Sequence, residues 1–530
     1  MTPQPQTQRQ TLNRSVSIAA AIMMASVLLS RVAGMFREMT LANLGGTSGE
    51  MDAYVAAFLI PELLNHFLAG GFLSVTFIPI FQKYIAENDE AGAWKTFSNM
   101  ITVGTAAFAA VLPAAVIFAP NLLSLTGFAN QPPETFALTV RLTRIILPAQ
   151  IFFYWGAFLM AVQYAKQKFF LPALAPLLYN LGIIAGGIIL CPIMGIEGFA
   201  WGVLAGAFLG NIAAQLPGAL SIGMRYRPRF SPTDPEFIHY IKLTVPLVAG
   251  LGMSFSNEIF FRYFASFLDS GAIAGANYAL RTMMILVGVF GQASGVAFYP
   301  YLAKLAAEKA YGQMSELLND TVNKVALYLL PLTGVMMALA PQIIMILYEH
   351  GKFTRQSTLE TAPILTMYLT GAFATSVSIL AARPFYAMQK TLLPMIVSTT
   401  VSILSVPLYY IFSRELGPKG LGLASGVAGT AQFLILYIIW EKKYGGFEAI
   451  REEAVKIGKI AAVSAVGAAV CHTVSGLING FGAIGEIGRI RTIIVCAVAS
   501  AVALITVFGL YEALGLQKFR ESVRGLARKR

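Results

Sequence analysis

The amino-acid sequence predicts an all-α polytopic membrane protein with about 14 transmembrane helices. Of its 530 residues, 56% are hydrophobic and only 12% are charged, whereas a soluble domain carries about 25% charged residues. Mean hydropathy is +0.67, and apolar runs long enough to cross a bilayer follow one another along the chain. A soluble fold could not bury this much apolar surface, so lipid must cover part of it.

The apolar runs locate the spans, each of which needs about 20 residues. The first run is longer than the apolar core of a signal peptide, so we expect it to be retained as a membrane helix. Prolines within later runs are compatible with membrane helices, because neighbouring helices can satisfy the freed backbone groups. The predicted spans are residues 15–36, 52–78, 97–119, 137–162, 171–191, 197–221, 239–262, 273–300, 322–347, 360–386, 392–413, 420–440, 457–478 and 490–513.

Lysine and arginine residues are concentrated in alternate loops, which predicts the orientation of the chain. The loops on the side of the N-terminus, together with both chain ends, hold about 25 of these residues, against about six on the opposite side. The positive-inside rule therefore predicts that both termini are cytoplasmic and that the number of spans is even. This distribution accounts for the net charge of +12 without a nucleic-acid partner.

The sequence contains no motif of a soluble enzyme or of a nucleotide-binding domain. Walker A, HExxH and GxSxG patterns are absent, and the spaced glycines of 482–488 lie in a short loop between two spans rather than in a strand–helix turn. The cysteines and histidines have neither CxxC spacing nor a clustered arrangement, so we expect no cofactor, disulfide framework or metal site. These residues are Cys191, Cys471, Cys496, His66, His239, His350 and His472.

Ionisable residues inside the predicted spans are the strongest functional signal. A charge in the bilayer costs about 2.5–3.5 kcal/mol on insertion scales, so such a side chain usually faces a cavity, a partner or the interface. The set is Arg31, Arg37, Glu38, Asp52, Glu62, His66, Arg141, Arg144, Glu258, Arg262, Arg281 and Arg383.

The first span ends in the charged stretch LSRVAGMFREM. At 3.6 residues per turn, Arg31 and Glu38 lie about 20° from alignment, and Arg37 lies about 120° from Arg31 and about 9 Å further along the axis. The arginines could extend to the membrane interface with Glu38 as counter-ion. Alternatively they could form an anion-binding wall, because the guanidinium group stays charged and donates paired hydrogen bonds to phosphate.

Three further charged residues occur in the seventh and eighth spans. Arg281 has no acidic residue three or four positions away, so it needs a partner from another helix, water or a ligand. Glu258 and Arg262 are spaced i,i+4 and could neutralise each other. Glu258 is also a possible ion site, although the structural pairing is the simpler interpretation.

Several stretches resemble the MurJ (MviN) lipid II flippases of the multidrug/oligosaccharidyl-lipid/polysaccharide exporter superfamily. The motifs are spread over nearly the whole chain, and their combination is more specific than any one of them. They are SRVAGMFRE (30–38), IPELLNHFLAGGFLSVTFIPIF (60–81), FLPALAPLLYNLGII (170–184), NYALRTMMILVGVFGQASGVAFYPYLA (277–303), LYEHGKFT (347–354), ARPFYAMQKTLLP (382–394) and GPKGLGLASGVAGT (417–430).

The resemblance implies a transporter rather than an enzyme, built from two six-helix bundles around a central cationic cavity with two additional C-terminal helices. It would move lipid II, an undecaprenyl-pyrophosphate-linked disaccharide-peptide, to the periplasmic leaflet of the bacterial inner membrane by alternating access. The expected partners are lipid II, membrane lipids and the peptidoglycan synthesis machinery. The expected regions are a tail (1–14), the first bundle (15–221), a basic linker (222–238), the second bundle (239–440), a linker (441–456), the last two helices with a lipid-tail groove (457–513) and a basic tail (514–530).

The resemblance also assigns substrate-binding residues. Arg31, Arg37 and Arg281 match arginines of the family's cavity, and Asp52 matches its aspartate. The second helix departs from the family pattern, because Asn65 and His66 occupy the positions of two arginines.

Two other classes of function compete with the flippase hypothesis. A drug or cation antiporter, or a flippase for another polysaccharide lipid, belongs to the same superfamily, but such antiporters bind cations with carboxylates, whereas most deep charges here are arginines. A lipid-modifying enzyme would need a convergent acid–base or metal set, and the acidic residues of the spans are too dispersed to form one.

Overall fold

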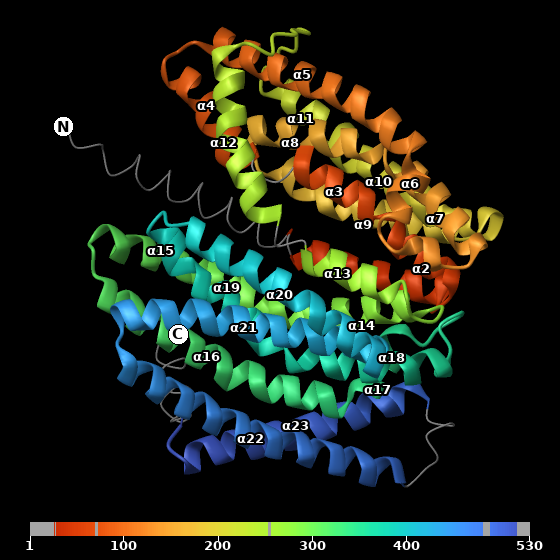
Figure 1. Ribbon diagram of the computed structural model, residues 1–530, viewed down its shortest axis with the longest axis vertical. Coiled ribbons are helices and arrows are strands. Elements are labelled where there is room, and N and C mark those ends of the chain that lie inside the picture. The colour runs from red at the N-terminus through yellow and green to blue at the C-terminus, as the bar shows by residue number, and fades with distance from the viewer. Residues whose placement is uncertain (1–25, 27, 69–72, 253–255, 481–487, 517–530) are drawn as a thin grey trace. The chain divides into compact units, whose positions relative to one another are not determined.

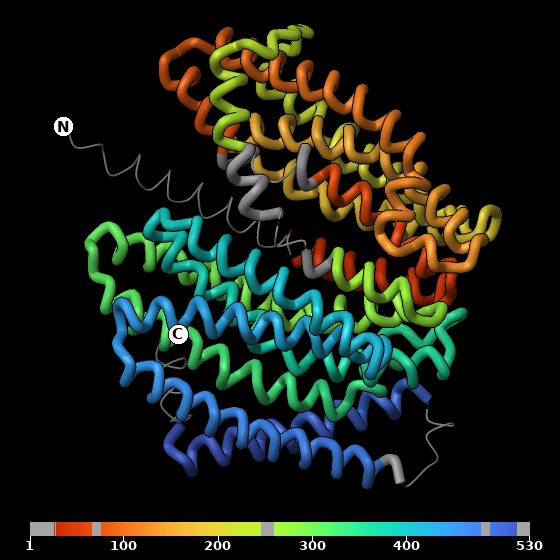
Figure 2. Tube along the Cα trace, in the orientation of Figure 1, coloured from red at the N-terminus to blue at the C-terminus, as the bar shows by residue number. Residues whose placement is uncertain are grey.

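A computed structural model describes residues 26, 28–68, 73–252, 256–480 and 488–516 of the chain (Figure 1), and Figure 2 traces the same residues as a coloured tube. Every regular element in these ranges is a helix, which confirms the all-α prediction. Eleven of the described helices are long and apolar enough to cross a membrane. They correspond to eleven of the predicted spans, and the other three, 15–36, 52–78 and 239–262, each include residues outside the described ranges.

The chain divides into two compact units. Unit 1 comprises residues 1–252 together with His350–Lys352, and unit 2 comprises residues 253–349 and 353–530. The division lies inside the predicted seventh span, so the first part of that span, helix α12 (Pro235–Gly252), packs with unit 1 against α3, α4 and α5.

Unit 1 begins with a helix over residues 28–45, which contains the charged stretch of the first span. The other helices of unit 1, besides α12, are α2 (Gly49–Ala57), α3 (Leu59–Leu68), α4 (Leu73–Ala86), α5 (Glu90–Ile117), α6 (Ala119–Ser124), η1 (Phe128–Asn130), α7 (Pro133–Ile146), α8 (Ala149–Ala165), α9 (Phe170–Met194), α10 (Glu197–Phe208), the π-helix η2 (Leu209–Ala213) and α11 (Gln215–Ser221).

Helices α9 and α10 pack with their backbones in contact, because glycines recur every four residues along both. A Cβ atom on Gly182 would lie 2.3 Å from the Cα of Gly206, and one on Gly186 would lie 2.4 Å from the Cα of Gly202. Small residues at this spacing allow the close backbone approach on which membrane helix packing depends, since lipid provides no hydrophobic drive between helices.

An aromatic core joins α4, α5 and α8. Phe77, Phe97 and Phe158 are fully buried, and the rings of Phe77 and Phe158 meet edge to face at 5.0 Å. The Tyr154 hydroxyl donates a hydrogen bond to the Met100 carbonyl at 2.8 Å. This core fixes the three helices relative to one another through aromatic packing.

Unit 2 contains the remaining long helices, and Figure 1 shows α22 and α23 side by side with α16. Its helices are α13 (Ser256–Ala265), α14 (Ala272–Leu286), the π-helix η4 (Val287–Ala293), α15 (Ser294–Ala307), α16 (Tyr311–Ala338), α17 (Ala340–Tyr348), α18 (Arg355–Thr370), α19 (Ala372–Ala387), α20 (Leu392–Leu416), α21 (Pro418–Tyr444), α22 (Phe447–Gly480) and α23 (Arg489–Ala513).

The last two helices pack on α16 through apolar side chains. One cluster joins Val335 of α16 and Leu339, the residue after this helix, to Cys471 of α22 and Ala503 of α23. A Cβ atom on Gly334 would lie 3.1 Å from the Cβ of Ala468, so the α16 and α22 backbones approach closely here.

A buried polar contact connects the start of α16 to the end of α21. The Ser315 hydroxyl lies 2.6 and 2.7 Å from the two carboxylate oxygens of Glu441, and neither side chain is exposed to solvent. A Cβ atom on Gly445 would collide with this carboxylate, which explains the glycine after α21.

Candidate functional site

The helix over residues 28–45 carries the charged groups of the first span, and these side chains differ in how far they are exposed. Arg31 is exposed, whereas the Arg37 side chain is 22% exposed and the Glu38 side chain 8%. Nη2 of Arg37 lies 2.5 Å from Oε1 of Glu38. The counter-ion contact that the structure gives Glu38 is therefore with its chain neighbour Arg37.

Asn180 on α9 holds the Arg37 guanidinium from the opposite side. Nη1 of Arg37 donates a hydrogen bond to Oδ1 of Asn180 at 3.0 Å, and Nδ2 of Asn180 donates to the Ser30 carbonyl at 3.3 Å. Sequence reasoning missed Asn180, although a buried asparagine inside a 25-residue apolar helix is a detectable signal.

Asp52 lies in the first turn of α2 and is 1% exposed. The Ser48 hydroxyl caps this helix by accepting a hydrogen bond from the Met51 amide at 3.3 Å. A carboxylate in a first helical turn is stabilised by the helix dipole, which provides a structural reason for an acidic residue here. The role of Asp52 in substrate binding stays a prediction.

The second helix contributes two polar positions to unit 1. Glu62 and Asn65 lie on α3 and are both half-buried. His66 is also part of α3, but its side chain lies outside the described part of the chain.

Arg281 lies on α14, less than two turns before the π-helix η4. It is half-buried, and its Nε atom is buried without a hydrogen-bond partner among the described residues. A buried donor without a partner costs about 1–3 kcal/mol. Short π-helical segments are frequent at functional sites, so the neighbouring η4 makes Arg281 a stronger candidate for a functional residue.

Arg383 on α19 shares this feature, because its Nε atom is also buried without a hydrogen-bond partner in the described part of unit 2. Its guanidinium carbon lies 5.7 Å from the centre of the Tyr299 ring, within the range of a cation–π contact. A Cβ atom on Gly295 would lie 3.2 Å from Nε of Arg383, so glycine leaves room for the side chain.

Other arginines of the spans have structural partners. Arg141 lies 3.5 Å from Glu197 with a 63% exposed side chain, and Nε of Arg144 donates a hydrogen bond to the Val116 carbonyl at 3.0 Å. Arg262 is 3% exposed, and the side chain of Glu258 lies outside the described part of the chain. The pairing or ion site predicted for Glu258 therefore stays a prediction.

The two units thus supply different kinds of cationic group. In unit 1, the Arg37 charge is partly neutralised by Glu38 and oriented by Asn180. In unit 2, the Arg281 guanidinium keeps an unused donor. Guanidinium groups with unused donors suit an anion such as a phosphate, because the planar fork donates paired hydrogen bonds. The described residues contain no group of three or more His, Cys, Asp or Glu side chains arranged for a metal ion.

Comparison with known proteins identifies the family. Residues 41–490 match the family described as "Lipid II flippase MurJ". A "Probable lipid II flippase MurJ" of Thermotoga maritima is 28% identical over 453 residues, which cover 85% of this chain and 89% of the relative. The solved structure titled "Lipid II flippase MurJ, inward closed conformation" matches with a TM-score of 0.77 and 25% identity, over 93% of this chain and 99% of that one.

A second solved structure has the same fold at low sequence identity. It is titled "Inward-facing conformation of a multidrug resistance MATE family transporter of the MOP superfamily", with a TM-score of 0.67, 14% identity and coverage of 80% of this chain and 98% of that one. The resemblance seen in the sequence motifs is confirmed by these matches. Because the family match extends over most of its length, this multi-pass membrane protein belongs to the lipid II flippase MurJ family.

Proposed function

We propose that this protein moves lipid II from the cytoplasmic to the periplasmic leaflet of the bacterial inner membrane, for peptidoglycan synthesis. The family match over residues 41–490 carries the proposal. The protein acts as a transporter by alternating access, and both termini are cytoplasmic, as the distribution of lysine and arginine indicates.

The substrate diphosphate is bound by Arg31, Arg37 and Arg281. Unit 1 supplies the first two arginines and unit 2 supplies the third. The buried, unused Nε donor of Arg281 supports this role, because a phosphate oxygen would satisfy it.

Asp52, Asn65 and His66 complete the proposed substrate site. Replacing two family arginines by Asn65 and His66 lowers the fixed positive charge of the second helix, so the three remaining arginines carry more of the binding. His66 restores a positive charge when it is protonated, because an ordinary imidazole titrates near pH 6.5.

The polyprenyl tail of the substrate follows the last two helices. Both α22 and α23 expose large apolar side chains, including Leu477, which is 65% exposed, and Ile505, which is 73% exposed. These surfaces are compatible with lipid and would let the tail remain in the bilayer while the headgroup crosses.

The membrane potential is a suitable energy source, because each charge that crosses 100 mV gains or loses about 2.3 kcal/mol. A cycle in which cationic groups move relative to the membrane could therefore be biased by potential. Glu258 is the first carboxylate to test as a ligand for a coupling cation.

Depletion of the native flippase in a bacterial host tests the proposal. Expression of this chain should restore lipid II translocation and prevent lysis. Restored drug resistance without lipid II translocation would instead support an antiporter, the alternative to which the multidrug-transporter fold likeness points.

A further inference from the structure

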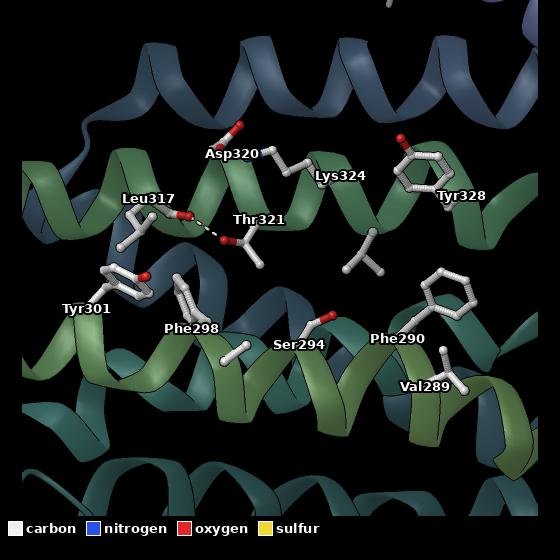
Figure 3. Close-up of a pocket in the computed structure, with 12 residues that line it drawn as sticks. Val289, Phe290, Ser294, Phe298, Tyr301, Leu317, Asp320, Thr321, Lys324 and Tyr328 are labelled. Atoms are coloured by element: carbon white, nitrogen blue, oxygen red, sulfur yellow. Dashed lines mark hydrogen bonds and ion pairs between the residues drawn. The ribbon is translucent and has the colours of Figure 1, made fainter. Parts of the chain in front are cut away.

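A groove runs along unit 2 between η4–α15 and α16, and its lining does not include Arg281 (Figure 3). Phe290, Ser294, Ala297 and Tyr301 line one wall at intervals of three or four residues. This spacing places side chains on one face of a helix. Four residues of α16 with the same spacing line the other wall, namely Leu317, Thr321, Lys324 and Tyr328.

The groove has the size and lining of a site for one acyl chain. Its volume is about 460 Å³. A group the size of a water molecule occupies about 30 Å³, so the groove holds about 15 such groups, comparable with the carbons of one fatty acyl chain. Tyr301 is 67% exposed, Val289 54% and Tyr328 42%, which leaves the groove open along its outer side.

A pair of opposite charges lies beside the groove on α16. Nζ of Lys324 lies 2.5 Å from Oδ2 of Asp320, and both side chains are more than half exposed. A helix of 28 residues such as α16 is about 42 Å long, about 12 Å longer than the hydrocarbon thickness of a bilayer. The N-terminal part of α16 can therefore reach the headgroup layer, and the pair lies where the apolar stretch of this helix begins.

We propose that this groove binds a phospholipid with a zwitterionic headgroup that carries a primary ammonium and a phosphate. The ammonium pairs with Asp320, the phosphate pairs with Lys324, and one acyl chain lies against Phe298 and Val325. Because the charges of Asp320 and Lys324 cancel, the pair offers an anionic headgroup no net attraction, whereas a zwitterionic headgroup can pair with both side chains. The charge pair also disfavours binding of the substrate's polyprenyl diphosphate, because the diphosphate carries several negative charges.

This inference rests on the membrane location of the chain and not on the proposed substrate. Its test is therefore lipid retention by the purified full-length protein, measured by native mass spectrometry after incubation with equal amounts of phosphatidylethanolamine, phosphatidylcholine and phosphatidylglycerol. We expect the wild-type protein to retain phosphatidylethanolamine preferentially. Asp320→Asn should reduce that preference about two- to fivefold, the range of an exposed ion pair. Lys324→Gln should lower the retention of all three lipids by a similar factor, because each of them carries the phosphate.

Filling the groove provides the second arm of the test. Ala297→Trp should lower the retention of all three lipids, whereas the control Ala107→Trp, at an exposed alanine of α5 in unit 1, should leave it unchanged. If Ala297→Trp fails to fold, Asp320→Asn carries the test, since it barely changes side-chain volume. Equal retention of the three lipids by the wild type, unchanged retention in Ala297→Trp, or displacement of phospholipid by a polyprenyl diphosphate would each overturn the proposal.

Discussion

Removing the Arg281 guanidinium should separate substrate binding from folding. In the proposed site this side chain donates charge-assisted hydrogen bonds to a phosphate, each worth about 1.5–3 kcal/mol. Arg281→Ala should therefore weaken lipid II binding by about ten- to hundredfold, since 1.4 kcal/mol corresponds to a factor of about ten. Arg281→Lys should recover only part of this loss, because an ammonium group keeps the charge but not the paired geometry.

The same substitution should leave folding almost intact. Nε of Arg281 is buried without a hydrogen-bond partner among the described residues, so its removal relieves an unsatisfied donor while the side-chain packing is lost. We expect the midpoint of thermal unfolding of Arg281→Ala to change by less than about 3 °C.

The assay is a binding titration of purified protein with lipid II, paired with a thermal unfolding measurement on the same samples. Arg141→Ala is the matched control, because this arginine is 63% exposed and already paired with Glu197. It should alter neither quantity appreciably. Equal binding by wild type and Arg281→Ala would refute the assignment of Arg281 to the diphosphate, and a large loss of stability would refute the reading of its environment.

Four further predictions concern unit 1. Arg37→Ala should lower the free energy of unfolding by about 1–3 kcal/mol, because Glu38 and Asn180 lose their hydrogen-bond donor. Chemical or thermal unfolding in detergent measures this change, and unchanged stability would contradict the prediction. Gly182→Ala should lower the free energy of unfolding by about 1–3 kcal/mol, because the new Cβ would lie 2.3 Å from a backbone atom. The control Gly458→Ala, with no neighbour within 4 Å, should leave the free energy of unfolding unchanged or raise it slightly. Lipid II flipping should weaken as pH rises from about 6 to about 8 as His66 loses its proton, and His66→Ala should abolish this dependence; a flat wild-type profile would remove the histidine from the mechanism. Asn65→Arg, which restores the family's charge, should tighten lipid II binding or slow its release.

Composition and apolar runs were sufficient to predict the helical class and the positions of most spans. Eleven predicted spans match long apolar helices of the structure. The prediction works because a bilayer requires each crossing segment to satisfy its own backbone hydrogen bonds within a continuous apolar helix. The π-helix Val287–Ala293 could not be predicted in this way, since it interrupts a helix without altering its apolar composition.

The candidate residues were visible in the sequence, but their contacts were not. Helical spacing aligned Arg31 with Glu38, whereas the structure pairs Arg37 with Glu38 through flexible side chains that adjacent positions can bring together. The bond from Arg37 to Asn180 connects residues 143 positions apart, which no local periodicity can reveal. Glycines recur every four residues along α9 and α10, and the structure identifies which of them meet.

The central claim is that this chain carries lipid II across a membrane through a cationic site. The most direct test is a flipping assay in proteoliposomes that contain the purified protein and labelled lipid II, with a membrane potential applied in either direction. We expect protein-dependent translocation that is lost in Arg281→Ala and retained in Arg141→Ala. Translocation that is absent in the wild type, or equal in wild type and Arg281→Ala, would contradict it.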